Sequence, residues 1–224
     1  MLIWHRAKAA HKMHPWILTL TLWLFSWPVL RDSVDRMHFV LQSHSALPLV
    51  DQRYADHPVA VLVHLVPGVV FFVIGPLQFN STLRRNRHLH RWVGYTYCWT
   101  AITSSLGVMY MVFAFPALGG TLTIAVTWAI CLAMCVAILA AIQAARVRHF
   151  MWHQSLMRLS FALGLTVATA RHYISAGRQL FDVPFVDSFT VASALGLMTN
   201  LAVLIWLERH RALRLWLDLR RSRA

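Results

Sequence analysis

The chain alternates long apolar segments with short polar loops. Apolar runs occupy residues 58–79, 92–115, 121–145, 155–176 and 188–207, and a shorter run occupies 16–30. A helix needs roughly 20 residues to cross a hydrocarbon core about 30 Å thick, and most of these runs are that long. The pattern therefore predicts an all-α, polytopic membrane helix bundle with about six transmembrane helices.

This pattern divides the chain into three parts. Residues 1–57 are expected to hold an N-terminal anchor helix, retained because no small-x-small cleavage site follows the first apolar run, and then a long outer loop. Residues 58–207 form the predicted five-helix transmembrane core. Residues 208–224 are basic, with apolar residues on one side of a helix, which is typical of an amphipathic cytoplasmic tail lying on the membrane surface.

Composition agrees with a membrane protein. The chain is 58% hydrophobic and 13% charged, with a mean hydropathy of +0.54. An ordinary globular domain is about half apolar and about a quarter charged. A soluble domain is therefore excluded as the interpretation of this chain.

The basic residues fall on alternate loops. The chain has 21 Lys and Arg residues and a formal net charge of +13. Most of them lie near the termini, in the hairpin around 84–91 or around 146–158; the opposite loops hold Arg31, Arg36, Arg53, Arg171 and Arg178. This positive-inside pattern predicts a multi-pass protein of the bacterial inner membrane with both termini cytoplasmic. The positive charge then faces anionic lipid headgroups, and nucleic acid is not expected as a partner.

The stretch from His64 to Tyr97 is the most distinctive part of the chain. It contains two apolar segments and, between them, a hairpin with four arginines within eight residues. His64 lies inside a predicted span, where an ionisable side chain is costly and therefore marks a candidate functional residue. We expect the helices that carry this stretch to line the interior of the bundle.

These motifs carry a family resemblance. The sequence resembles an uncharacterised bacterial membrane family, domain of unknown function 2306, over roughly residues 57–207. The resemblance lies in HLVPG, GPLQF, LRR and HLHRWVGYTY, and later in His153, Met157, Arg158 and Arg171. Leu156 stands where that family commonly has a tryptophan. The resemblance implies a multi-helix membrane protein and implies no established activity.

Four histidines suggest a cofactor. His64 and His172 are expected toward the outer face of the membrane, and His90 and His153 toward the inner face. Two histidines from different helices at one level can ligate a haem iron from both sides. This plan is similar to that of transmembrane di-haem cytochromes b, and the histidines are therefore candidate ligands of haem b.

Arginines at the same two levels fit this hypothesis. A guanidinium group binds carboxylates well and could pair with haem propionates. The candidates are Arg84, Arg91 and Arg158 at the inner level and Arg171 at the outer level. Gly68, Gly94 and Gly164 would leave room for a flat ring. The sequence therefore suggests a b-type haem electron carrier, with a quinone or a redox protein as its partner.

Two other functions stay open. The chain has no Walker, Rossmann, G-x-S-x-G or H-E-x-x-H motif, and the last five predicted spans have no carboxylate in their interiors. The histidines at loop ends are also compatible with a place among headgroups. The alternative is a non-redox small-molecule transporter, with His64 as substrate contact, or a structural membrane protein. The third is a membrane enzyme acting on lipid or quinone, an oxidoreductase if it is an enzyme.

Overall fold

The computed structural model describes residues 14–41, 54–114 and 120–221, and every regular element within these ranges is a helix. The all-α prediction is confirmed. The elements are α1 (Pro15–Leu41), α3 (Pro58–Ile74), the 3₁₀ helices η2 (Gly75–Phe79) and η3 (Leu83–Arg85), α4 (Arg87–Ala114), α5 (Gly120–Arg146), α6 (Phe150–Gly164), α7 (Thr166–Phe181) and α8 (Phe185–Arg221).

Four segments of the described chain are long and apolar enough to cross a membrane. They are Pro58–Phe79, Arg87–Ala114, Gly120–Arg146 and Asp187–Arg211, and they coincide with four of the predicted spans. The two remaining predicted spans, 16–30 and 155–176, take a different form. They correspond to α1 and to the pair α6 and α7.

Helix α1 is longer than its apolar run. It continues to Leu41, through the charged start of the predicted outer loop, where the helical spacing of Val34, Met37, His38 and Leu41 indicates a short interfacial helix. Arg31 and Asp35 are one turn apart and form an ion pair at 3.7 Å. Such i, i+4 pairs support a helix where apolar residues have ended, which explains the extension.

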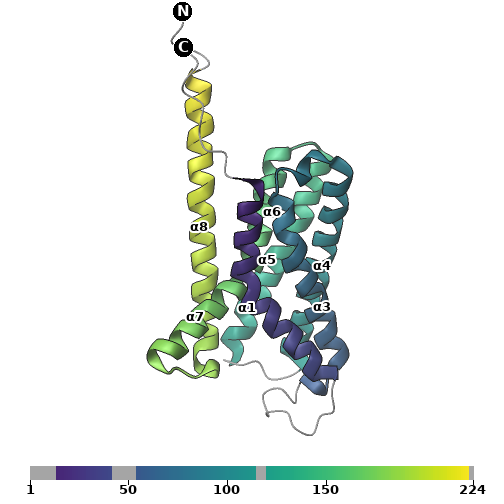
Figure 1. Cartoon of the computed structure of the whole chain (residues 1–224), viewed down its shortest axis with the longest axis vertical. Helices are drawn as coiled ribbons and strands as arrows, with labels where there is room; N and C mark the ends of the chain where they lie inside the picture. The colour runs from purple at the N-terminus through teal and green to yellow at the C-terminus, as the bar shows by residue number, and fades with distance from the viewer. Residues whose placement is uncertain (1–13, 42–53, 115–119, 222–224) are drawn as a thin grey trace, which may run out of the picture.

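The predicted span 155–176 is divided at Leu165. Helix α6 ends at Gly164 and α7 begins at Thr166. Figure 1 shows α7 running obliquely away from the direction of α6. The residues of α7 therefore do not continue the faces that a straight helix would give them.

The loops alternate between two ends of the bundle. One end of the bundle carries η2 and η3, and we call it the hairpin end. Helix α1 begins there, and helices α5 and α8 finish there. Helix α7 lies at the opposite end, the α7 end (Figure 1). This alternation follows the predicted order of the loops. The cytoplasmic placement of the hairpin end stays a prediction.

The basic tail is not a separate element. Helix α8 runs without interruption through the expected boundary at 208 and as far as Arg221 (Figure 1). Residues 207–221 contain no Gly or Pro that would end a helix. Residues 222–224 lie outside the described part of the chain.

Aromatic rings form the centre of the bundle between α3, α4 and α6. Phe71 lies with its ring centroid 5.1 Å from that of Tyr97 and 5.7 Å from that of Phe161. Tyr97 is fully buried, and its hydroxyl is 2.9 Å from Ser160 Oγ. Gly164 has no Cβ, which leaves space for the ring of Phe71. This packing holds the three helices in register.

A buried asparagine fixes the hairpin. Asn80 Oδ1 accepts hydrogen bonds from the amides of Thr82 (2.9 Å) and Leu83 (3.3 Å). Its Nδ2 donates to Pro15 O and to Thr19 Oγ1, both at 3.3 Å. Asn80 thus closes the hairpin and ties it to the start of α1.

Candidate functional site

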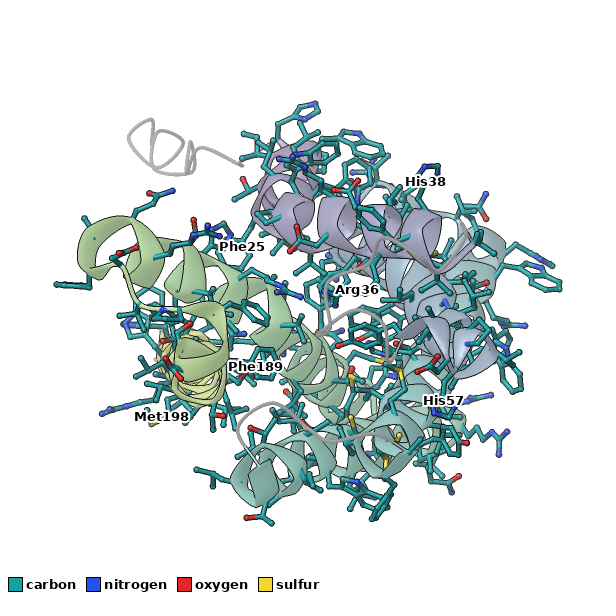
Figure 2. All side chains as sticks on the ribbon, turned by 90° about the horizontal axis from the view of Figure 1, so that it is seen from below. Phe25, Arg36, His38, His57, Phe189 and Met198 are labelled. Atoms are coloured by element: carbon teal, nitrogen blue, oxygen red, sulfur yellow. The ribbon has the colours of Figure 1, made fainter. Side chains whose placement is uncertain are left out.

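A cavity of about 290 Å³ lies between the helices in the half of the bundle nearer the α7 end. Side chains of α1, α3, α4, α5, α6, α7 and α8 contribute to its lining. Figure 2 looks along the bundle from the α7 end and shows Arg36 near the centre of the ring of helices. The volume is close to the lower end of the range for small-molecule sites, roughly 300 Å³.

His64 lies in the wall of this cavity with a fixed orientation. Its Nδ1 is 2.9 Å from the carbonyl oxygen of Ser104, while Ser104 Oγ donates to His64 O at 2.9 Å. A carbonyl oxygen only accepts, so Nδ1 carries the proton, and in a neutral ring Nε2 is then an acceptor. Gly107 packs directly on the backbone of His64, because a Cβ there would be 2.9 Å from His64 N.

An ion pair joins α7 and α1 at the α7 end of the cavity. Arg171 Nε is 3.4 Å from Asp32 Oδ2, and the Arg171 side chain is 19% exposed. The guanidinium also lies over the ring of Phe185, 5.5 Å from its centroid. Arg36 lines the same cavity, and its guanidinium lies 4.7 Å from the centroid of the Tyr54 ring. Among the described residues of this lining, the charged groups are therefore two guanidinium groups and one carboxylate.

Hydroxyl groups supply the remaining polarity. They belong to Ser33, Tyr54, Ser104, Ser105, Thr123, Thr127, Thr166, Thr190 and Ser193. Thr123 and Thr190 join α5 to α8 through a hydrogen bond of 2.6 Å. Thr166 is 2% exposed, and its Oγ1 bonds to no described residue. A buried hydroxyl without a partner costs about 1–3 kcal/mol.

The aromatic centre closes the cavity toward the hairpin end. Phe71 and Phe72 belong to the cavity lining, and their rings pack edge to face at 5.1 Å. Closer to the hairpin end lie Tyr97, Phe161 and Phe79. The ring centroids of Phe161 and Phe79 are 5.2 Å apart. The cavity therefore occupies one half of the bundle and does not continue through it.

At the hairpin end, His90 lies in the first turn of α4 and His153 in the first turn of α6. A proton on His90 would be repelled by a charged His153 and by the guanidinium group of Arg84. His153 Nδ1 is 3.0 Å from Ala141 O, so this nitrogen donates and Nε2 is left as the acceptor. The pair is half-buried.

Arg158 is bound by protein groups. Its Nε donates to Glu208 of α8, and its terminal nitrogen donates to Ser155 Oγ at 3.2 Å. Ser155 donates in turn to Glu208 at 3.2 Å. Arg84 and Arg91, the other inner arginines, are exposed. The sequence prediction missed Glu208 because it was assigned to the tail, although an arginine in a span needs an acid at the same level.

His172 does not lie with His64. Its Nε2 is 2.9 Å from Phe25 O, and its ring packs on that of Phe25 with centroids 4.6 Å apart. The side chain is exposed and does not line the cavity. The turn at Leu165 is the cause, since it points this part of α7 toward α1.

The structure therefore bears differently on the two haem sites that the sequence suggested, one at the outer and one at the inner level. At the outer level His64 and His172 are apart, and this arrangement does not fit a haem held by two histidines. The glycines that were expected to leave room for a haem ring instead lie against side chains of the protein. Gly68 lies against Ser104, Gly94 against Gln78 and Gly164 against Phe71. At the inner level, His90 and His153 each supply one imidazole, and a haem between them stays a prediction. Within the described ranges, no group of three or more His, Cys, Asp or Glu residues is placed to hold a metal ion.

The sequence prediction also missed Asp32 and Arg36. It ended the first helix at residue 30 and placed both charges in the outer loop, just before or within a separate short interfacial helix. The alternation of opposite charges four residues apart, Arg31 with Asp35 and Asp32 with Arg36, was the signal that a helix continues there.

Comparison with known proteins identifies one family. Residues 61–207 match a family described as predicted membrane protein (DUF2306). No curated protein and no solved structure matches the chain.

Proposed function

The chain belongs to this family of predicted membrane proteins, and on that premise we propose that it is a transporter that binds a small organic molecule in the cavity at the α7 end. The observation that carries the proposal is a cavity of about 290 Å³ with polar groups at one end and packed aromatic rings at the other. Transporters bind their substrates near the middle of the membrane, in a site open to one side at a time. With the hairpin end in the cytoplasm, this cavity would be open to the outside.

Three groups are proposed to contact the substrate. His64 would accept a hydrogen bond through Nε2, because Ser104 holds its Nδ1 as the donor. Thr166, which also lines the cavity, would rotate its buried and unpartnered hydroxyl toward the substrate. Apolar side chains such as Val108 and Ile130 would contact the body of the molecule. The proposal thus keeps His64 as the principal polar contact.

A cavity-filling variant tests this proposal. Thr127→Trp on α5 places an indole in the cavity, and Leu132→Trp places the same group on an outward-facing position that is 49% exposed. Thermal unfolding of each purified protein is measured with a panel of small aromatic and aliphatic carboxylates, alcohols and amines. A ligand at 100 times its Kd stabilises the folded state by about 2.7 kcal/mol. We expect at least one compound to raise the Tm of the wild type and of Leu132→Trp but not of Thr127→Trp. If no compound does so, or if all three proteins respond equally, the proposal is wrong.

A second candidate function rests on the inner histidine pair. His90 and His153 would hold one b-type haem, because Ala141 orients His153 and leaves its Nε2 for iron. Such a haem supplies one-electron transfer, with a quinone or redox protein as partner. Reduction with dithionite would then give α and Soret bands that His90→Ala and His153→Ala abolish and His172→Ala leaves unchanged. A preparation that stays colourless after haem supplementation would contradict this candidate.

A further inference from the structure

We propose that the contacts between α1 and α7 form a latch that closes the mouth of the cavity, and that the cavity opens when these two helices separate. This inference rests on the proposed function, because it names the part of the molecule that admits the substrate. It starts from two neighbouring residues of α7. Arg171 and His172 both contact α1, and Arg171 also lines the cavity.

The first contact of the latch is the ion pair of Arg171 with Asp32. Arg171 Nε lies 3.4 Å from Asp32 Oδ2, and the two side chains are 19% and 45% exposed. Both residues belong to the cavity lining, so the pair lies where α1 and α7 border the cavity. Ion pairs that are partly open to solvent are weak, so α1 and α7 can separate and rejoin during a transport cycle.

The second contact is made by the next residue along α7. His172 Nε2 lies 2.9 Å from Phe25 O, and because a carbonyl oxygen only accepts, this nitrogen carries the proton. The rings of His172 and Phe25 also pack together, with centroids 4.6 Å apart. Phe25 lies seven residues before Asp32, which is two turns of α1. The latch therefore holds α1 at two levels.

The joint at Leu165 lets α7 move without the rupture of a continuous helix. Leu165 belongs to neither α6 nor α7. In an unbroken helix the amide of Thr166 would donate to the carbonyl of Ala162. This carbonyl accepts instead from Asn200 Nδ2 of α8, at 3.1 Å, and Asn200 Oδ1 accepts from Thr169 Oγ1 at 2.9 Å. The start of α7 is thus held by a side chain of α8.

The latch joins two parts of the bundle that are each supported separately. On one side, α7 packs closely on α8, because a Cβ at Gly196 would lie 2.9 Å from Thr166 O. Tyr173 of α7 and Thr199 of α8 are also joined, with 2.8 Å between their hydroxyl oxygens. On the other side, Val40 of α1 is buried in a cluster with residues of α3 and α4. Each part therefore stays packed when the latch opens.

The test measures how often the mouth of the cavity opens. Thr127→Cys is introduced after the native Cys98, Cys131 and Cys135 are replaced by alanine. The full-length protein in lipid nanodiscs is treated with N-ethylmaleimide, which is uncharged, so that a change of charge in the latch does not attract or repel it. A second protein keeps Cys98 as its sole thiol. Cys98 is buried in α4 and does not line the cavity, so its reaction rate reports general loosening of the bundle.

The expected result is faster reaction at position 127 when the latch is weakened, because the rate follows the population of the open state. Asp32→Asn and Arg171→Gln break the same ion pair, and each should raise the rate by about fivefold. The double variant should react no faster than either single variant. His172→Ala removes the second contact and should raise the rate to a similar extent. Asp35→Asn is the matched control, because it breaks an exposed ion pair within α1, and it should leave the rate unchanged.

The outcomes separate this inference from the proposed function. If the thiol at position 127 reacts in no variant, the cavity admits no small molecule, and the transporter proposal fails together with the latch. If this thiol reacts at one rate in every variant, the cavity is reached without the latch, so the latch is overturned and the transporter proposal stands. An equal increase with Asp35→Asn, or at Cys98, would show general loosening and would also overturn the latch. An increase confined to position 127 and to the latch variants supports the inference.

Discussion

Individual polar residues hold this bundle together at positions that hydrophobicity does not reveal. Asn80 is fully buried and bonds to two amides, a carbonyl and a hydroxyl. His64 and Ser104 exchange two hydrogen bonds between α3 and α4. The sequence identified His64 as unusual because ionisable groups are rare in spans. It did not identify Asn80, and it did not identify Ser104 as the partner of His64, because a single polar residue in an apolar run does not show its partner.

The role of Asn80 can be measured. Asn80→Ala removes four hydrogen bonds and leaves buried groups unpaired, so we expect it to lower the free energy of unfolding by about 1–3 kcal/mol. Asn86→Ala is the control, because Asn86 is exposed and its Oδ1 accepts one hydrogen bond, from the Leu89 amide. That change should cost about 1 kcal/mol or less. Thermal unfolding in detergent compares the two, and an equal loss of stability would contradict the structural role of Asn80.

Whole helices were predicted better than their ends. The apolar runs at 58–79, 121–145 and 188–207, and the described part of the run at 92–115, are continuous helical segments because their length and composition leave few alternatives. The extension of α1 lies where the apolar residues have ended, and the break at Leu165 lies inside an apolar run. A hydrophobic run carries neither kind of information. For that reason the predicted outer pair of His64 and His172 is separated in the structure.

Helix packing near the break gives a second prediction. Gly164→Leu should destabilise the protein by about 1–3 kcal/mol, because the added side chain collides with the ring of Phe71. Gly177→Leu in α7 is the matched control, since a Cβ there meets no atom within 4 Å. Thermal unfolding of both variants measures the difference. Wild-type stability in Gly164→Leu would show that α3 and α6 do not pack at this glycine.

At the scale of the molecule, the two ends of the bundle differ in chemistry. The hairpin end carries exposed arginines, the His90 and His153 pair and the ion pair of Arg158 with Glu208. The α7 end carries the cavity and the ion pair of Arg171 with Asp32. The sequence predicted this division by charge. It could not predict the cavity, because a cavity is formed by side chains of many helices and has no local signature.

The most direct test of the central claim is which side of the membrane reaches the cavity. The Thr127→Cys variant without other cysteines is treated with membrane-impermeant sulfonatoethyl methanethiosulfonate in intact spheroplasts and in inside-out vesicles. Arg85→Cys, at the exposed hairpin, reports the opposite side in the same preparations. We predict that the thiol at position 127 reacts in spheroplasts and is protected in inside-out vesicles, while the thiol at position 85 shows the reverse. Reaction of both thiols from the same side would contradict a cavity that opens at the α7 end.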